Sequence, residues 1–216
     1  MSAILFLTVA DDPQTWAALG FTLDGATARL GSTAITLTGA DPGAKGVTGW
    51  NLADDSPLPA SIEGLRTTAT PGLTPAPPAP VHPNGISAID HLVVMTPNLS
   101  RTVAAFEDLG WECRRTRAAA AYGQQNMRQA FFWFGDVIVE VVGPETPDPA
   151  KADRPASFFG LALTATDLDA TAAFFGDLMK PPIDAVQTGR RISTISSRAG
   201  SSVAIAVMSA HLKESP

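Results

Sequence analysis

Two side chains in the middle of the sequence, His91 and Glu140, are of the types that bind a divalent metal or move protons. Glu140 stands between two valines, so we expect it to lie away from open solvent. Burying an ionised carboxylate is costly unless a cation, a hydrogen-bond donor or a proton compensates it. We therefore expect Glu140 to contact His91, a metal ion or an arginine such as Arg128 or Arg191.

Further residues are candidates for lining a binding site. The aromatic run 131–134 alternates along a strand, so two of its members are expected in the core and Trp133 in a pocket. Arg190 and Arg191 lead a strand, and such a pair either binds a carboxylate or, more often, gives one solvated side chain and one structural ion pair. Gly160 lies inside an apolar strand, which leaves space for a ligand or an approaching backbone. The candidate substrate-binding residues are Arg128, Trp133, Gly160 and Arg191.

Regular elements flank the two chemical residues. Residues 88–94 form an alternating strand, and apolar residues at 99, 103, 106 and 109 predict one face of a helix that ends at Gly110. Two strands, 129–134 and 137–142, surround Gly135. Alternation places Ile89, His91 and Val93 on one strand face, and places Glu140 on the same face as the residues at 136, 138 and 142.

The same order of elements recurs along the sequence. The pattern of the middle segment is repeated in the last third of the chain. It comprises a strand at residues 158–164, a helix with apolar residues at 168, 172, 175 and 178, and strands at 191–195 and 203–208. A shorter copy lies at residues 4–37, and residues 46–54 resemble another opening strand without an evident helix. A strand–helix–three-strand unit covers only one face of its sheet, so units must pair. The sequence therefore predicts an α+β fold in which repeated βαβββ modules pair into a cupped, curved mixed sheet with helices outside.

Composition limits the classes of partner. The chain has 216 residues, of which 45% are hydrophobic and 17% charged, so it can bury a sizeable core. The net charge is -6 and no cluster of lysine or arginine occurs, which argues against nucleic acid and anionic membranes as partners. Cys113 is the only cysteine, and the first ten residues lack the basic flank of a signal segment. These features favour a cytoplasmic protein.

Proline marks the boundaries between segments. Residues 67–87 contain six prolines, which favour an extended connector. We expect degenerate N-terminal module(s) over residues 1–66, a linker over 67–87, a first core module over 88–145 and a second core module over 156–210.

Three features of the middle segment resemble the vicinal oxygen chelate superfamily. They are the strand 89–94 with its histidine, the helix that ends in Leu-Gly-Trp, and the segment 135–140 with its glutamate. This superfamily includes glyoxalase I, the bleomycin-resistance proteins and the extradiol dioxygenases. The resemblance implies paired βαβββ modules around a divalent metal, with ligands on the first and last strand of each module. His91 and Glu140 match the first-module positions.

The second module departs from this family pattern. The positions that correspond to His91 and Glu140 are Gly160 and Ala206, and neither has a side chain that binds a metal. Two protein ligands leave most of the coordination shell to water or substrate. The only further imidazoles belong to His82, in the linker, and His211, near the end of the chain.

Two functions are compatible with these residues. In the first, a glyoxalase-like protein has a small-molecule cavity where His91 and Glu140 hold Fe, Mn, Ni or Zn for lyase, isomerase or dioxygenase chemistry, with Glu140 able to move protons if it leaves the metal. In the second, a non-catalytic protein of the bleomycin-resistance type binds or sequesters a small molecule and has a degenerate metal site. Modules pair within one chain or between the two copies of a homodimer.

Overall fold

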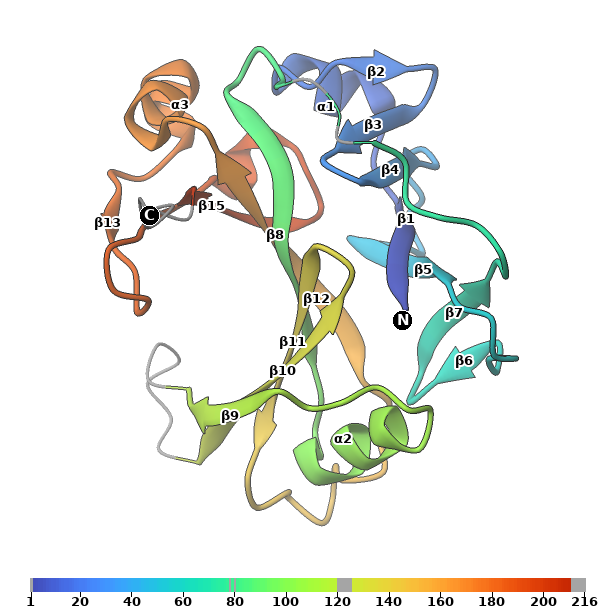
Figure 1. The fold of residues 1–216 in the computed structure, drawn as a ribbon. Helices are drawn as coiled ribbons and strands as arrows, with labels where there is room; N and C mark the ends of the chain where they lie inside the picture. The colour runs from blue at the N-terminus through green and yellow to red at the C-terminus, as the bar shows by residue number, and fades with distance from the viewer. Residues whose placement is uncertain (1, 78, 80, 120–125, 211–216) are drawn as a thin grey trace, which may run out of the picture.

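The protein consists of two mixed β-sheets with helices packed on their outer faces (Figure 1). The computed structural model describes residues 2–77, 79, 81–119 and 126–210. The predicted α+β class, with its mixed curved sheet and outer helices, is confirmed. Within the described residues no helix is long and apolar enough to cross a membrane.

The larger sheet is built from two units of the same element order. The first comprises β8 (Ile86–Met95), α2 (Leu99–Glu107), β9 (Arg115–Ala118), β10 (Met127–Phe134) and β11 (Val137–Pro144). The second comprises β12 (Ser157–Ala165), α3 (Leu168–Phe175), the 3-10 turn η2 (Gly176–Leu178), β13 (Ile183–Asp184), β14 (Arg191–Thr194), η3 (Ser197–Ala199) and β15 (Ala204–Ser209). The helices and strands predicted for these two segments are therefore present.

The two units join at their opening strands. The strand order is β13-β14-β15-β12-β8-β11-β10-β9, with β8 antiparallel to β12 and each opening strand parallel to the closing strand of its own unit. The sheet curves around the open side at the left of Figure 1, and α2 and α3 lie on its outer side. We call the inner side of this curve the concave face.

The N-terminal sheet has seven strands in the order β2-β3-β4-β1-β5-β7-β6. Its elements are β1 (Ala3–Val9), α1 (Pro13–Ala18), β2 (Leu23–Asp24), β3 (Thr27–Leu30), β4 (Thr33–Leu37), β5 (Val47–Ala53), β6 (Ser61–Ile62) and β7 (Leu65–Ala69). The opening strand expected at residues 46–54 is β5, and the residues between β5 and β6 contain no helix. Strand β7 extends into the segment expected to be a linker, and β8 begins at Ile86, within its end.

Side-chain caps fix the starts of the two outer helices. Asn98 accepts a hydrogen bond from the Arg101 amide at the start of α2, and Asp167 accepts from two amides at the start of α3. Phe106 on α2 and Phe175 on α3 point into the core. Each helix is thus anchored at its first turn and packs its apolar face on the outer side of the sheet.

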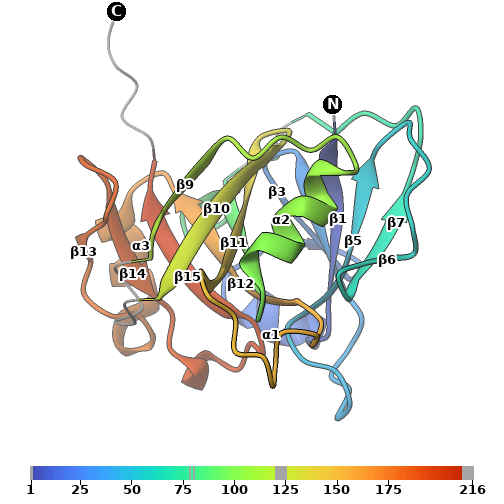
Figure 2. The ribbon, with the colours of Figure 1, turned by 90° about the horizontal axis from the view of Figure 1, so that it is seen from below.

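An aromatic cluster fills the seam between the two sheets. The Trp50 ring on β5 lies 6.1 Å from Phe106, 5.4 Å from Phe134 and 5.5 Å from Phe158, measured between ring centroids. Figure 2 shows α2 in front of this seam. The Trp50 indole also donates a hydrogen bond of 2.7 Å to Thr67. The N-terminal sheet therefore shares one core with the larger sheet.

Polar contacts close the same seam at its edge. Asp11 accepts hydrogen bonds from the Trp16 indole at 2.8 Å, from the Ser201 hydroxyl at 2.8 Å and from the Ser202 amide at 2.9 Å. The Ser202 hydroxyl in turn accepts from the Gly46 amide. The end of β1 is thus tied to the loop before β15.

We predict that Trp50→Ala lowers the free energy of unfolding by about 3–5 kcal/mol, because it removes a large buried ring from the seam. The control is Trp133→Ala, whose side chain is half-exposed and whose removal is expected to cost under about 1 kcal/mol. Urea denaturation followed by circular dichroism measures both. Equal losses for the two variants would contradict a core shared by the sheets.

Candidate functional site

A β-bulge in β8 sets the geometry of the site. In the pairing of β8 with β12, Ile89 lies opposite Leu163, whereas His91 lies opposite Ala162. Strand β8 therefore contains one extra residue, Asp90, at this point. A bulge interrupts the alternation of side chains along a strand, so two consecutive residues can reach the same side. Asp90 and His91 do so, because Oδ1 of Asp90 and Nδ1 of His91 are 2.8 Å apart.

The bulge also corrects one expectation from strict alternation. Ile89 packs in the main core together with Leu92, whereas Val93 belongs to a separate apolar cluster that includes Val142. The predicted common face for Ile89, His91 and Val93 is wrong for Ile89, since the extra residue reverses its direction relative to the residues that follow.

His91 and Glu140 meet on the concave face. Nε2 of His91 lies 3.4 Å from Oε2 of Glu140. The His91 side chain is 19% exposed and that of Glu140 is 6% exposed, so the imidazole is the more accessible of the two groups. The other carboxylate oxygen, Oε1 of Glu140, accepts a hydrogen bond from the side-chain amide of Gln129. Gln129 in turn accepts a 2.6 Å hydrogen bond from Nε of Arg117.

Asp90 has a second partner on its other side. Arg190 donates from Nη2 to Oδ2 of Asp90 at 2.5 Å, and both side chains are almost fully buried. Burial raises the pKa of the Asp90 carboxyl, but hydrogen bonds from His91 and Arg190 and the positive charge of Arg190 outweigh burial and lower the pKa to about 2. Asp90 is therefore a carboxylate at neutral pH.

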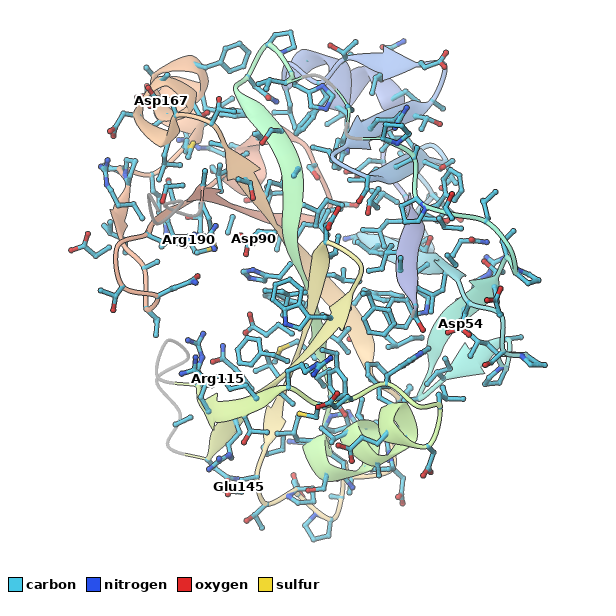
Figure 3. The ribbon with its side chains drawn as sticks, viewed as in Figure 1. Asp54, Asp90, Arg115, Glu145, Asp167 and Arg190 are labelled. Carbon is cyan, nitrogen blue, oxygen red and sulfur yellow. The ribbon has the colours of Figure 1, made fainter. Side chains whose placement is uncertain are left out.

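A continuous line of polar side chains thus crosses the concave face, and we call it the polar chain. Its members, in spatial order, are Arg190, Asp90, His91, Glu140, Gln129 and Arg117. They come from β8, β9, β10, β11 and the residue before β14. Figure 3 labels Arg190 and Asp90 close together beside the open side of the curved sheet. With a neutral imidazole, two arginines balance two carboxylates.

The arginines expected to contact Glu140 lie elsewhere. Arg128 pairs with Glu145 at 3.2 Å, and Arg191 pairs with Asp169 at 2.7 Å. The hydrogen bond that Arg191 donates to Asp169 raises the pKa of its guanidinium. Arg191 is thus an exposed, ion-paired side chain, and its buried neighbour Arg190 makes the structural ion pair that the sequence suggested for one member of the doublet.

The aromatic run divides as predicted, with two members in the core. Phe132 and Phe134 are fully buried, whereas Trp133 is 50% exposed. The ring of Phe131 lies under the guanidinium of Arg117, with 5.0 Å between the guanidinium carbon and the ring centroid. Phe131 and Trp133 alternate with the core residues and therefore belong to the concave side.

Trp133 also lines a groove of about 370 Å³ that lies against the turn between β3 and β4. The groove reaches Asp90 and Ile138, and Ile138 is the register partner of His91 in the pairing of β8 with β11. A molecule in this groove would therefore lie next to the polar chain.

Gly160 is explained by a neighbouring backbone. A Cβ atom at this position would lie 2.4 Å from the carbonyl oxygen of Ala204 on β15. Of the two readings of this glycine, an approaching backbone and space for a ligand, the structure supplies the first. Ala206 on β15 carries no ligand atom either, so the second unit adds no metal ligand at these two positions.

The remaining histidines do not complete a metal site. Both ring nitrogens of His82 are used in the N-terminal sheet, where Nδ1 accepts from the Thr22 amide and Nε2 lies 2.9 Å from the carbonyl oxygen of Arg29. Burial lowers the pKa of His82 despite the hydrogen bond to Arg29. His211 lies outside the described residues. Among the described residues, no three His, Cys, Asp or Glu side chains group around a possible metal position.

His91 and Glu140 themselves fit two ligands of one ion. Two ligands that are each about 2.1 Å from a tetrahedral ion lie roughly 3.4 Å from each other. Oε2 of Glu140 faces Nε2 of His91 at that separation, while Oε1 is held by Gln129. The donor set therefore fits a divalent ion that takes the rest of its shell from water or substrate.

Three members of the polar chain have no role in the sequence-based prediction. Asp90 escapes notice because a bulge cannot be recognised from alternation alone. Gln129 and Arg117 are polar residues that lie opposite each other in the pairing of β10 with β9, and this pairing is the signal that could have identified them. That pairing joins residues of two separate strands and depends on their register.

Comparison with known proteins identifies the fold. The sequence pattern of the glyoxalase/bleomycin resistance protein/dioxygenase superfamily matches residues 90–191. A variant of 4-hydroxymandelate synthase from Streptomyces coelicolor superposes with a TM-score of 0.64 and 15% identity over 99% of this chain and 94% of that chain. No curated protein sequence matches the chain significantly.

Methylmalonyl-CoA epimerases are also similar over part of the chain. The Streptomyces coelicolor protein in complex with 2-nitronate-propionyl-CoA gives a TM-score of 0.47 and 21% identity over 61% of this chain and 99% of that chain. The Mycobacterium tuberculosis protein gives 0.47 and 17% over 59% and 91%.

We predict that the stabilising effect of Asp90 disappears in acid. Its folded pKa of about 2 lies below the ordinary 3.8, so the carboxylate stabilises the fold above about pH 4, and this contribution is lost as the pH falls toward 2. The difference between the two pKa values corresponds to about 2 kcal/mol. Urea unfolding at pH 7, 5, 4 and 3 should show a gap between wild type and Asp90→Asn that shrinks with acid.

The matched control is Asp169→Asn, because Asp169 is an exposed carboxylate whose pKa is lowered by Arg191. Its effect on stability should stay small at every pH. A gap for Asp90→Asn that does not depend on pH would contradict the assignment.

Proposed function

Because residues 90–191 match the sequence pattern of the glyoxalase/bleomycin resistance protein/dioxygenase superfamily, we propose that this chain is an enzyme that transfers a proton on a small anionic carbonyl compound at its concave face. The reactive pair is His91 and Glu140. The observation that supports this proposal is the 3.4 Å distance between Nε2 of His91 and Oε2 of Glu140. Asp90 contacts the other ring nitrogen of His91, and Gln129 donates a hydrogen bond to the other carboxylate oxygen of Glu140. The reaction class is an isomerase or a lyase.

The arrangement suits general acid–base chemistry. A base and an acid must lie within reach of the same substrate proton, and their orientation must be fixed. Oε2 of Glu140 is available because Oε1 is occupied by Gln129, and Nε2 of His91 is available because Nδ1 contacts Asp90. A substrate carbon bound in front of Nε2 and Oε2 could lose a proton to one of them and regain it from the other.

An anionic substrate is favoured by the arginines of β9. Arg115 and Arg117 lie on the same side of this short strand, since they are two residues apart. Arg115 pairs in register with Phe131, which alternation places on the concave side, and Figure 3 labels it at the lower edge of the open side. A guanidinium binds a carboxylate with two hydrogen bonds. Trp133 would contact the less polar part of the molecule in the adjoining groove.

A divalent ion such as Fe, Mn, Ni or Zn would be held by His91 and Glu140. When bound it would polarise the carbonyl oxygen of the substrate and stabilise the negative charge that follows loss of the proton. Because Nε2 and Oε2 would then be its ligands, Glu140 would have to leave the ion in order to take part in proton transfer. The remaining residues of the polar chain would keep the two ligands oriented, because Asp90 contacts His91 and Gln129 contacts Glu140.

The alternative is a binding or sequestering protein without turnover. It is favoured by Gly160 and Ala206, which leave the second unit without ligands where the first unit has His91 and Glu140. In that case the His91–Glu140 contact would close the sheet surface and a ligand would bind through the groove at Trp133 and through Arg115.

We predict that the protein catalyses exchange of the C3 protons of pyruvate or 2-oxobutyrate in D₂O above the rate without protein. Glu140→Gln and His91→Gln should each reduce this rate by about 10²–10⁴-fold, because each removes one proton-transfer group while keeping its size. Proton NMR of the substrate measures the exchange. The control is Arg128→Met, whose side chain pairs with Glu145.

Exchange that persists in both His91→Gln and Glu140→Gln would contradict the proposal. An absence of exchange together with saturable shifts of the Trp133 indole signal on addition of the same acids would favour the binding protein.

We further predict that Zn²⁺ or Mn²⁺ binds with a stoichiometry of one and that His91→Ala abolishes this binding, because one of two protein ligands is lost. Isothermal titration calorimetry of the wild type, His91→Ala and His82→Ala measures the effect. His82→Ala serves as the control, since His82 is occupied by Thr22 and Arg29. Binding that survives in His91→Ala would place the ion elsewhere.

A further inference from the structure

We infer that Asp90 and Arg190 are positioning residues that hold His91 in one tautomer, with the proton on Nδ1 and the lone pair of Nε2 directed at Glu140. This inference deepens the proposed function, since it states how the reactive nitrogen is prepared. The second unit of the sheet thereby contributes to the site through Arg190, although it supplies no metal ligand at Gly160 or Ala206.

Asp90 lies between two hydrogen-bonding partners, Arg190 and His91. Its Oδ2 faces the guanidinium of Arg190 at 2.5 Å, and a guanidinium only donates hydrogen bonds. Asp90 is thus paired with a permanent positive charge in a buried place, where a carboxylate needs such a partner. A carboxylate only accepts hydrogen bonds, so Nδ1 of His91, 2.8 Å from Oδ1, must carry the proton that joins them.

Arg190 is fixed by further hydrogen bonds to Ser209 and Gln187. Nε and Nη2 donate to the backbone carbonyl of Ser209 at 3.0 and 2.7 Å, and Nη1 donates to the side chain of Gln187 at 3.0 Å. These contacts hold the plane of the guanidinium independently of Asp90. Because the Arg190 side chain is only 3% exposed, water has little access to the ion pair. The orientation of Asp90 is therefore set from β15 and the loop before β14.

The proton on Nδ1 determines the state of the other ring nitrogen of His91, Nε2. A neutral imidazole with its proton on Nδ1 has a lone pair on Nε2. This lone pair faces Oε2 of Glu140 across 3.4 Å. Two electron-rich atoms at this distance attract a proton or a cation between them. With the opposite tautomer, Nε2 would donate a hydrogen bond directly to Glu140. The two atoms would then bind neither a further proton nor a cation between them.

The structure also contains an internal reference for the opposite tautomer. In His82, Nδ1 accepts a hydrogen bond from the amide of Thr22, so its proton lies on Nε2, which contacts the carbonyl oxygen of Arg29. One chain thus holds two described histidines in opposite states, and a single spectrum can distinguish them.

The test is a long-range ¹H–¹⁵N NMR spectrum of the uniformly ¹⁵N-labelled chain at pH 8.5, with signals assigned by their loss in His91→Gln and His82→Gln. We expect the pattern of a protonated Nδ1 for His91 and that of a protonated Nε2 for His82. A protonated Nε2 in His91, or the signal of an imidazolium, would overturn the inference.

Variants of the two adjacent arginines test the role of Arg190. Arg190→Met should shift His91 to a mixture of tautomers, Arg190→Lys should restore most of the wild-type pattern, and Arg191→Met should leave it unchanged, since Arg191 pairs with Asp169 on the surface. If Arg190→Met does not fold, Asp90→Asn replaces it, with the same expected mixture. A wild-type pattern in the folded variant would overturn the role of these residues.

Affinity for Zn²⁺ is a second measurement of the positioning role of Arg190. Where the wild type binds Zn²⁺, Arg190→Met should bind it about 10–100-fold more weakly and Arg191→Met should bind it equally well. Failure of proton exchange on 2-oxo acids, together with a protonated Nδ1 in His91, would remove the proposed reaction and leave the tautomer assignment in place.

Discussion

The antiparallel pairing of β8 with β12 is the constraint on which the rest of the larger sheet depends. Each opening strand uses one edge to pair in parallel with the closing strand of its own unit. The other edge of β8 pairs with the other edge of β12, and this pairing joins the two units. The pairing is irregular at Asp90, and that irregularity brings two consecutive polar side chains to the concave face. The site and the sheet thus have a common origin in one strand pair.

Electrostatic compensation explains why so many polar groups are tolerated there. A buried carboxylate is costly alone, but Asp90 is compensated by Arg190 and Glu140 by Gln129, which itself accepts from Arg117. The polar chain ends in an arginine on each side. His91 lies in its middle, between the carboxylates of Asp90 and Glu140.

Most of the fold could be predicted from residue spacing. The period of 3.6 residues in segments 99–109 and 168–178 identified the two outer helices, and Gly135 between two apolar strands identified the hairpin of β10 and β11. These signals are local, since a turn or a helix face is determined by residues close in sequence. Ile89 marks where such reasoning fails, because a bulge depends on which residues of the partner strand form hydrogen bonds.

By itself the sequence determined the succession of elements, the class of fold and the two residues, His91 and Glu140, whose chemistry suits an enclosed site. Only the tertiary structure decided the partners of these two residues. Arg190 lies 100 residues from Asp90 in the chain, and its doublet partner Arg191 is equivalent in type but points away. Strand register and sheet curvature determine which of two adjacent arginines reaches a buried carboxylate. Neither register nor curvature can be predicted from the residue spacing of one segment.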